Sequence, residues 1–221
     1  MRIEGLSVVI PALNAAATLP AVLAALGDAP AEVLVVDGGS TDGTTAPRLI
    51  TAPRGRGTQI AAGIAAARGP WLLLLHADTR LAPGWAEAAG VAMASPDRAA
   101  YFRFALDDAA PQARRLERAV AWRCRVLGLP YGDQGLLIHR DLLAQVGGMR
   151  PLPLMEDVDL VRRLGRARLA ALPVAAVTSA ARWRRDGWWA RSARNLTCLA
   201  LFYAGLPPGM IARIYTGRGR R

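Results

Sequence analysis

The sequence contains no lysine. Its 28 basic residues are all arginines and only 17 residues are acidic, so the formal net charge is +11. Arginine prefers partners that it can bind through paired hydrogen bonds, such as phosphate and carboxylate. The charge therefore indicates nucleic acid, an anionic membrane surface or a phosphorylated small molecule as a partner, or simply reflects an arginine-rich composition.

Cysteine is scarce as well, with Cys124 and Cys198 as its two occurrences. Two cysteines do not form a disulfide framework, so we expect two reduced thiols and a cytoplasmic protein. We expect no signal peptide, because the first residues run directly into an expected strand. The longest late apolar run, residues 196–206, is shorter than the roughly 20 residues that cross a bilayer.

Two binding signatures are also missing. No Gly-x-Gly-x-x-Gly follows the first expected strand, which disfavours a dinucleotide-dependent dehydrogenase. The arginines are scattered and no nucleic-acid recognition motif is present, so we expect no nucleic-acid partner. A non-catalytic arginine-rich protein that binds nucleic acid or a membrane stays open as an alternative function.

A run of four leucines is the clearest structural signal. Residues 72–75 are all leucine, and His76, Ala77 and Asp78 follow them. Such a run is typical of a strand buried on both faces of a parallel sheet. Ligands of open α/β sheets bind beyond the carboxyl ends of the strands. Asp78 is therefore well placed to hold a cation against a phosphate.

Strands and helices alternate at short spacing through the first hundred residues, which predicts an α/β fold with a mostly parallel sheet flanked by helices. Gly27 is a plausible helix stop and Thr18 a possible cap. The tail is predicted to be a helical extension interrupted at residues 207–208. Strands are expected at 6–10, 32–36, 48–52, 71–75, 99–106 and 136–138, with one or two at 168–177; helices at about 15–26, 58–68, 84–94, 111–127, 141–146, from 155, and from 188.

The loop at residues 37–44 reads Asp-Gly-Gly-Ser-Thr-Asp-Gly-Thr and follows an apolar strand. Its glycines allow backbone N–H groups to approach a ligand closely. With the opening residues 7–14, Ser-Val-Val-Ile-Pro-Ala-Leu-Asn, this loop resembles the family 2 glycosyltransferases of the GT-A fold, a Rossmann-like fold. A narrower resemblance, to the radical-SAM/selenodomain-associated or arsenosugar-biosynthesis-type transferases, is carried by residues 55–59, 75–79, 132–135, 153–158 and 178–183.

The resemblance implies one domain over residues 1–221. Residues 1–106 would form the nucleotide-sugar-binding half, residues 107–185 the acceptor and catalytic half, and residues 186–221 the helical extension. Ala15 departs from the family, in which Glu often follows the Asn at position 14. The nucleotide pocket implied by the resemblance comprises Pro11, Leu13, Asn14, Asp37, Gly39, Arg54, Gln59 and Asp78.

The resemblance also implies a bound Mn²⁺ or Mg²⁺. Asp78 matches the last Asp of the family's Asp-x-Asp metal motif, and His76 stands where the first Asp usually lies. Histidine ligates Mn²⁺ in some sites and orients a neighbouring group in others. We expect Asp78 to be a metal ligand and keep His76 as a second candidate.

The acidic pair Glu156 and Asp157 is implied to supply the catalytic base, with Asp157 favoured. Acids in the first turn of a helix also interact favourably with its dipole. Near a phosphate and other acids, we expect a raised pKa for the base. Asp133 and Gln134 would contact the acceptor or the sugar, and Arg182 and Trp183 would close over the pyrophosphate or form a solvated basic turn.

The resulting hypothesis is an inverting, metal-dependent transferase of a hexosyl or related group, with a UDP-sugar as donor and a small molecule or a lipid as acceptor. A nucleotidyltransferase on a related fold stays open, although it would want a lysine in a glycine-rich loop. The tryptophan- and arginine-rich segment from Trp188 is expected to form a peripheral membrane contact at the inner face of the membrane, a homodimer face or a lid.

Overall fold

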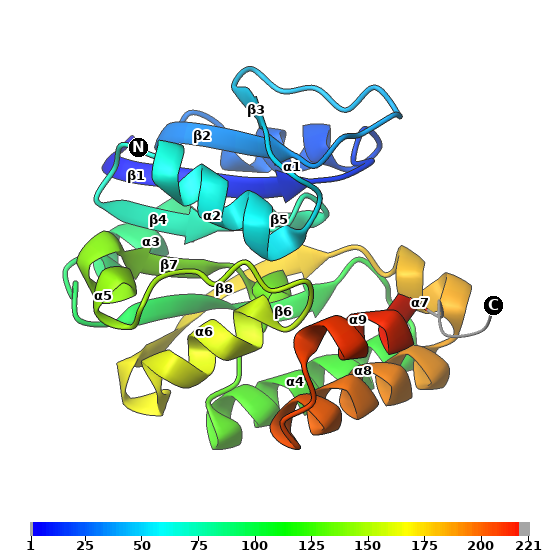
Figure 1. Cartoon of the computed structure of the whole chain (residues 1–221). Coiled ribbons are helices and arrows are strands. Elements are labelled where there is room, and N and C mark those ends of the chain that lie inside the picture. Colours follow the sequence, from blue (N-terminus) through cyan, green and yellow to red (C-terminus); the bar gives the residue numbers. More distant parts are fainter. Residues whose placement is uncertain (1, 217–221) are drawn as a thin grey trace.

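The computed structural model describes residues 2–216. Figure 1 shows an α/β molecule built on one eight-stranded sheet with the strand order β3-β2-β1-β4-β7-β6-β8-β5. This is the predicted fold class. The strands are β1 Ile3–Ala12, β2 Pro30–Asp37, β3 Leu49–Thr51, β4 Trp71–Leu74, β5 Thr79–Leu81, β6 Ala99–Leu106, β7 Leu136–His139 and β8 Leu169–Thr178.

The helices cover both faces of this sheet (Figure 1). Those of the first half are α1 Leu19–Leu26, α2 Arg56–Ala66 and α3 Trp85–Ala92. Those of the second half are α4 Pro111–Leu127, α5 Arg140–Gln145, α6 Glu156–Leu164, α7 Ala181–Asp186, α8 Trp188–Tyr203 and α9 Pro208–Thr216, with short 3-10 turns at Gly132–Gln134 and Arg166–Arg168.

The leucine run forms the buried centre of the sheet, as predicted. Leu72 and Leu74 pack in the apolar cluster that also contains residues of α2, α4 and α6. Leu73 and Leu75 pack on the other face, in the cluster under α1 and α3. Because successive side chains of a strand point to opposite faces, only a strand covered on both sides needs such a run.

The sheet is less parallel than the strand–helix alternation suggested. Strands β1, β2, β3 and β4 pair in parallel, as does β6 with β8. Strand β7 lies antiparallel between β4 and β6, and the short strand β5, which was not predicted, lies antiparallel against β8. Since strands of residues 1–106 and 107–185 share this sheet, we keep the single-domain division as our proposal.

The C-terminal extension is helical and is interrupted as predicted: Pro207 lies between α8 and α9, and Pro208 begins α9. Arg182 and Trp183, for which a solvated basic turn was one of two alternatives, lie in helix α7. Gly27 ends α1 with φ 56°, whereas Thr18 makes no side-chain capping hydrogen bond. Among residues 2–216, no helix combines the length and apolar character needed to cross a membrane.

Candidate functional site

A cavity of about 450 Å³ opens at the carboxyl ends of β1 and β4. Six of the eight residues predicted for the nucleotide pocket line it, together with ten residues outside that prediction. The predicted residues are Pro11, Leu13, Asn14, Arg54, Gln59 and Asp78, and the added ones include Arg56, His76, Ser179 and Ala181. We call this the donor cavity.

Asp37 and Gly39 are outside the lining of the donor cavity. The Asp37 carboxylate accepts hydrogen bonds from the N–H groups of Gly39 and Ser40 and from the Ser40 hydroxyl. Burial raises its pKa, but these hydrogen bonds outweigh burial and leave the pKa below the usual Asp range. In the described structure, Asp37 closes its own glycine-rich loop.

The loop is also tied to strand β1. Asn14 has φ 50°. Its Oδ1 accepts a hydrogen bond from the Thr41 N–H at 2.9 Å, and its own backbone N–H donates to the Ser40 hydroxyl at 2.8 Å. Asparagine tolerates this left-handed conformation better than most residues. The Asp-Gly-Gly-Ser-Thr segment therefore acts as a brace that fixes one wall of the donor cavity.

Gln59 joins the ends of two strands. Its side-chain amide donates to the carbonyl oxygens of Ala12 and Val36, at 2.7 Å each, and it is buried beneath Gly38. A Cβ at Gly38 would come within 3.0 Å of the Gln59 amide carbon. The Gln59 amide nitrogen is thus occupied by hydrogen bonds to the backbone, and we now propose that Gln59 supports the pocket rather than contacting the nucleotide.

Asp78 lies between β4 and β5 at the mouth of the donor cavity. Its carbonyl accepts the Ser179 N–H, which fixes the loop to the end of β8. The adjacent Thr79 hydroxyl meets the Thr178 hydroxyl at 2.8 Å, which in turn donates to the Asp133 carbonyl. The Asp78 carboxylate remains one-fifth exposed and lies 3.8 Å from the Arg182 guanidinium.

Helix α6 presents the predicted acidic pair in its first turn. Met155, just before the helix, has φ 65°, a conformation that costs a non-glycine residue about 1–3 kcal/mol. Glu156 is fully buried and forms an ion pair with Arg56, and Arg56 Nη2 lies 3.7 Å from Asp157 Oδ2. Glu156 lines neither the donor cavity nor the cavity described next, so Asp157 is the better placed base.

Arg56 is the main site residue that the sequence reasoning missed, although it lies within the Gly-Arg-Gly motif at 55–57. The sequence feature that pointed to Arg56 was the neighbouring Gly57, where a Cβ would come within 2.8 Å of the Leu152 carbonyl oxygen. Only a glycine allows the start of α2 to pack this closely against residues 150–152. This packing places the Arg56 side chain against Glu156, a hundred residues further along the chain.

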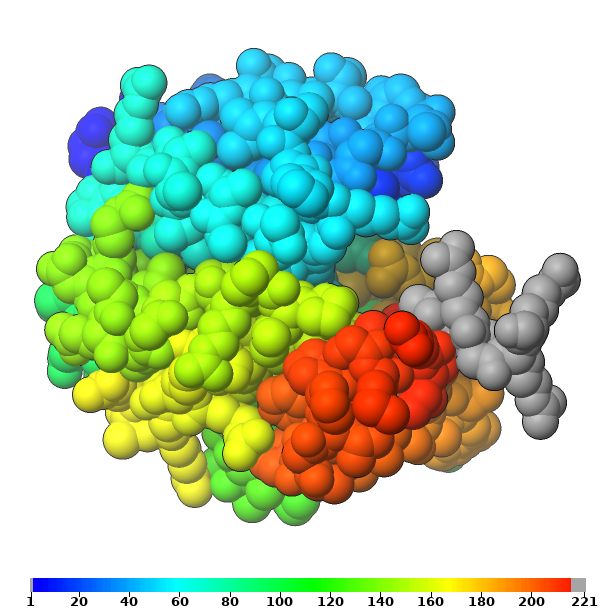
Figure 2. Space-filling model, viewed as in Figure 1, coloured from blue at the N-terminus to red at the C-terminus, as the bar shows by residue number. Residues whose placement is uncertain are grey.

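A second cavity, of about 210 Å³, adjoins the donor cavity and is here called the acceptor cavity. The two cavities share four lining residues, which are Arg56, His76, Asp78 and Arg182. Figure 2 shows a hollow between the cyan surface of the first half and the red surface of α9. The other residues of the acceptor cavity include Tyr131, Asp133, Asp157, Thr178, Trp183, Arg191, Asn195 and Tyr215.

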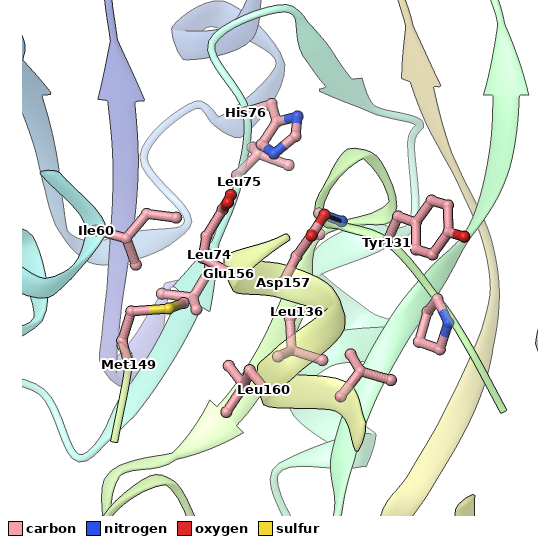
Figure 3. Close-up of a pocket in the computed structure, with 14 residues that line it drawn as sticks. Ile60, Leu74, Leu75, His76, Tyr131, Leu136, Met149, Glu156, Asp157 and Leu160 are labelled. Carbon is pink, nitrogen blue, oxygen red and sulfur yellow. Dashed lines mark hydrogen bonds between the residues drawn. The ribbon is translucent and has the colours of Figure 1, made fainter. Parts of the chain in front are cut away.

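Gly132 lies between Asp157 and His76 at the centre of the site. Its N–H donates to Asp157 Oδ2 at 2.8 Å, and a Cβ at this position would come within 2.6 Å of His76 Nε2. Figure 3 shows His76 and Asp157 on either side of a small cavity, with Glu156 beside them and apolar residues such as Leu160 and Met149 below. The backbone at position 132 therefore sets the spacing between Asp157 and His76.

Burial and the charged groups around Gly132 shift the pKa values of several side chains. Burial raises the pKa of Asp157, but Arg56 and the Gly132 N–H outweigh it and lower the pKa below the usual Asp range. The raised pKa that we expected for Asp157 was therefore wrong. Burial, with neighbouring Asp157 and Asp78, instead raises the pKa of Asp133 to about 6. Burial and Arg56 lower the pKa of His76 to about 4, so its imidazole is neutral at pH 7.

Of the other acceptor-side predictions, Asp133, Arg182 and Trp183 line the acceptor cavity. Gln134 is buried, and its amide already bonds the protein: Nε2 donates to the Phe102 carbonyl at 3.0 Å, and Oε1 accepts from the Cys124 thiol and the Tyr131 N–H. We therefore now propose a structural role for Gln134.

Replacing Gly132 with alanine should disable the site. The new methyl group would collide with His76 and crowd Asp157, so we expect a loss of about 1–3 kcal/mol in folding stability and a loss of activity larger than this instability explains. Thermal unfolding and turnover measure the two effects. Gly209→Ala is the control, because no atom lies within 4 Å of its Cβ position; equal behaviour of the two variants would contradict the assignment.

Comparisons with known proteins show the family and the fold of the chain. Residues 7–128 match the family model described as glycosyl transferase family 2. No curated protein sequence matches the chain. Glucosyl-3-phosphoglycerate synthase from Mycobacterium tuberculosis, solved with Mn²⁺ and UDP-glucose, is similar in fold, with a TM-score of 0.57, 20% identity, and coverage of 78% of this chain and 70% of that one.

GalNAc-T7, solved with UDP, GalNAc and Mn²⁺, is similar too. Its TM-score is 0.60 at 15% identity, over 79% of this chain and 43% of that one. At these identities the two structures establish the shared fold. What they bind is a property of those proteins.

Proposed function

The chain belongs to glycosyl transferase family 2, and we propose that it transfers a sugar from a UDP-sugar, with inversion at the anomeric carbon, to a hydroxyl group of an acceptor. The observation that carries this proposal is the meeting of the two cavities at Arg56, His76, Asp78 and Arg182. One cavity suits a nucleotide and the other holds the carboxylates. The reacting groups would meet at their junction.

The donor cavity supports the binding of a nucleoside diphosphate. Pro11 and Asn14 line it at the end of β1, and Arg54 lines it from the loop before α2. Arg56 and Arg182 place two guanidinium groups at the junction, where the diphosphate would lie. Arginine binds phosphate oxygens through paired hydrogen bonds, which orients the leaving group as well as attracting it.

A divalent cation fits this junction. The described residues contain no cluster of three metal-ligating side chains, but Asp78 and the neutral His76 face the same space. Mg²⁺ and similar ions are commonly held by one or two protein groups together with substrate phosphates. When bound, Mn²⁺ or Mg²⁺ would neutralise charge that develops on the departing nucleoside diphosphate. We propose Asp78 as the ligand, with His76 beside it.

Asp157 is proposed as the general base. Its lowered pKa keeps it ionised at neutral pH, and its Oδ2 is oriented by the Gly132 N–H. The carboxylate takes the proton of the acceptor hydroxyl while the hydroxyl oxygen bonds to the anomeric carbon. The bond from that carbon to the diphosphate oxygen breaks, and the electron pair leaves with the nucleoside diphosphate.

The pathway stays a proposal, and two alternative functions are disfavoured. The resemblance to the radical-SAM/selenodomain-associated transferases is a hypothesis about the pathway, and it predicts a small-molecule acceptor. A nucleotidyltransferase is disfavoured by the absence of lysine. A non-catalytic arginine-rich binding protein is disfavoured because it needs neither the carboxylates nor their shared cavity.

Calorimetric titration of UDP, with and without Mn²⁺, tests the proposed donor. We expect binding that is tighter in Mn²⁺, because cation and nucleotide would complete one site together. GDP, dTDP and CDP serve as comparison ligands and should bind more weakly. Absence of binding by all four nucleotides would contradict the proposed function.

A further inference from the structure

A third cavity, of about 540 Å³, lies between α4 and α8 and is here called the apolar groove. Its walls are mainly apolar or aromatic. From α4 come Leu116, Ala119, Val120, Trp122 and Leu127, and from α7 and α8 come Trp183, Trp188, Trp189, Leu196 and Leu199. A volume of this size is typical of cavities that hold a small organic ligand.

The apolar groove continues into the acceptor cavity. Tyr131, Asp133, Trp183 and Asn195 line both. Two buried polar atoms at this connection have no hydrogen-bond partner among the described residues, Asp133 Oδ1 and the indole Nε1 of Trp183. Buried polar groups are nearly always paired. An unpaired acceptor and an unpaired donor, on two residues that line both cavities, suit a hydroxyl group, which can both donate and accept.

The rim of the groove and the surface around it are apolar as well. Of the ten large hydrophobic side chains that are exposed in residues 2–216, eight lie on α4, α8 and α9. These helices lie together at one end of the molecule (Figure 1). The eight are Trp122, Val126, Leu127, Trp189, Leu196, Tyr203, Met210 and Ile214.

The same helices are strongly basic. Together α4, α8 and α9 carry eight arginines and one acidic residue, Glu117. Arginine mixed with exposed tryptophan and leucine is typical of helices that lie in the interface of an anionic membrane. Charge and apolar surface thus favour a lipid over a water-soluble occupant of the groove.

We propose that the acceptor is a hydroxyl-bearing membrane lipid, whose apolar chain lies in the groove between α4 and α8. Its hydroxyl head reaches Asp133 and Trp183 and faces Asp157 in the acceptor cavity. In the transfer, the lipid oxygen bonds to the anomeric carbon, its proton passes to Asp157, and the nucleoside diphosphate leaves with the bonding electrons. This inference rests on the proposed function and narrows its acceptor to one class.

Transfer to alkyl β-glucosides of increasing chain length, kept below their micelle concentrations, tests the proposal. Each methylene that enters the groove should raise kcat/KM about threefold to fourfold, until the groove is filled. Leu196→Glu places a charge in the groove and Ala119→Phe fills it, and both positions are exposed enough to leave folding intact. Both variants should remove the chain-length dependence and keep Mn²⁺-dependent UDP binding.

A second readout does not depend on turnover. Four of the six tryptophans line the groove, so a diacylglycerol with brominated chains, in vesicles containing phosphatidylglycerol, should quench the fluorescence of the wild type more than that of Leu196→Glu. The control is Val91→Glu, an exposed apolar residue on α3, which should behave as the wild type.

Three results would overturn the proposal. If UDP binding is intact but the transfer rates do not depend on chain length and the fluorescence is not quenched, the proposed function stands with a water-soluble acceptor. If the wild type is a dimer and Leu196→Glu is a monomer, the occupant of the apolar groove is a second copy of the chain. Absence of nucleotide binding in the wild type would remove the proposed function, and the lipid acceptor with it.

Discussion

Asp157→Asn should abolish turnover and leave UDP binding intact. The amide keeps the shape of the side chain but cannot take a proton, and loss of a general base typically costs about 10²–10⁴-fold in rate. Asp157 is ionised at neutral pH and lies at the edge of the acceptor cavity, so its removal acts on chemistry rather than on the nucleotide. Initial rates and calorimetry on the same preparation separate the two effects.

The matched control is Asp159→Asn on the same helix. Asp159 pairs with Arg150 and Arg163 and lines neither cavity of the site, so this variant should lose some stability and little activity. Full activity of Asp157→Asn, with loss in Asp133→Asn, would transfer the role of base to Asp133.

The pH profile distinguishes these two bases. A base acts only when deprotonated, so a rate that depends on Asp133 would fall as the pH drops through about 6. The pKa of Asp157 is lowered instead, so a rate that depends on Asp157 should stay level through that range. The profile should be measured as kcat/KM, which reports groups of the free enzyme.

Asp78→Ala should remove the effect of Mn²⁺ on UDP binding. We expect the Kd in Mn²⁺ to weaken on the order of a hundredfold, equivalent to ~3 kcal/mol. Asp78 is the carboxylate shared by the donor and acceptor cavities, and the described residues offer no three-ligand site nearby. Calorimetry of UDP with and without Mn²⁺, on wild type and variant, measures the change.

Two controls accompany this experiment. Asp97→Ala removes an exposed carboxylate that lines neither cavity of the site, so this variant should bind UDP as the wild type does. Mn²⁺ alone should bind the wild type weakly, because the nucleotide is expected to supply the remaining ligands. An unchanged Mn²⁺ effect in Asp78→Ala would refute the metal assignment.

Much of the fold could be predicted from local sequence. The strand at Ala99–Leu106 and the helix at Pro111–Leu127 have the predicted bounds, because alternation and helical periodicity are properties of neighbouring residues. The reversed direction of β7 could not be predicted in this way. An apolar run of three residues has the same pattern in either direction, and only the path of the chain decides which one it takes.

The candidate site, too, could be predicted only in part from local sequence. The sequence by itself determined that Asp78 follows a buried strand and that Glu156 and Asp157 open a helix, since both features are local. Only the tertiary structure decided that Arg56 pairs with Glu156, that Gly132 separates His76 from Asp157, and that Gln59 and Gln134 hold the backbone. These contacts join residues far apart in the chain, and packing alone brings them within hydrogen-bonding distance.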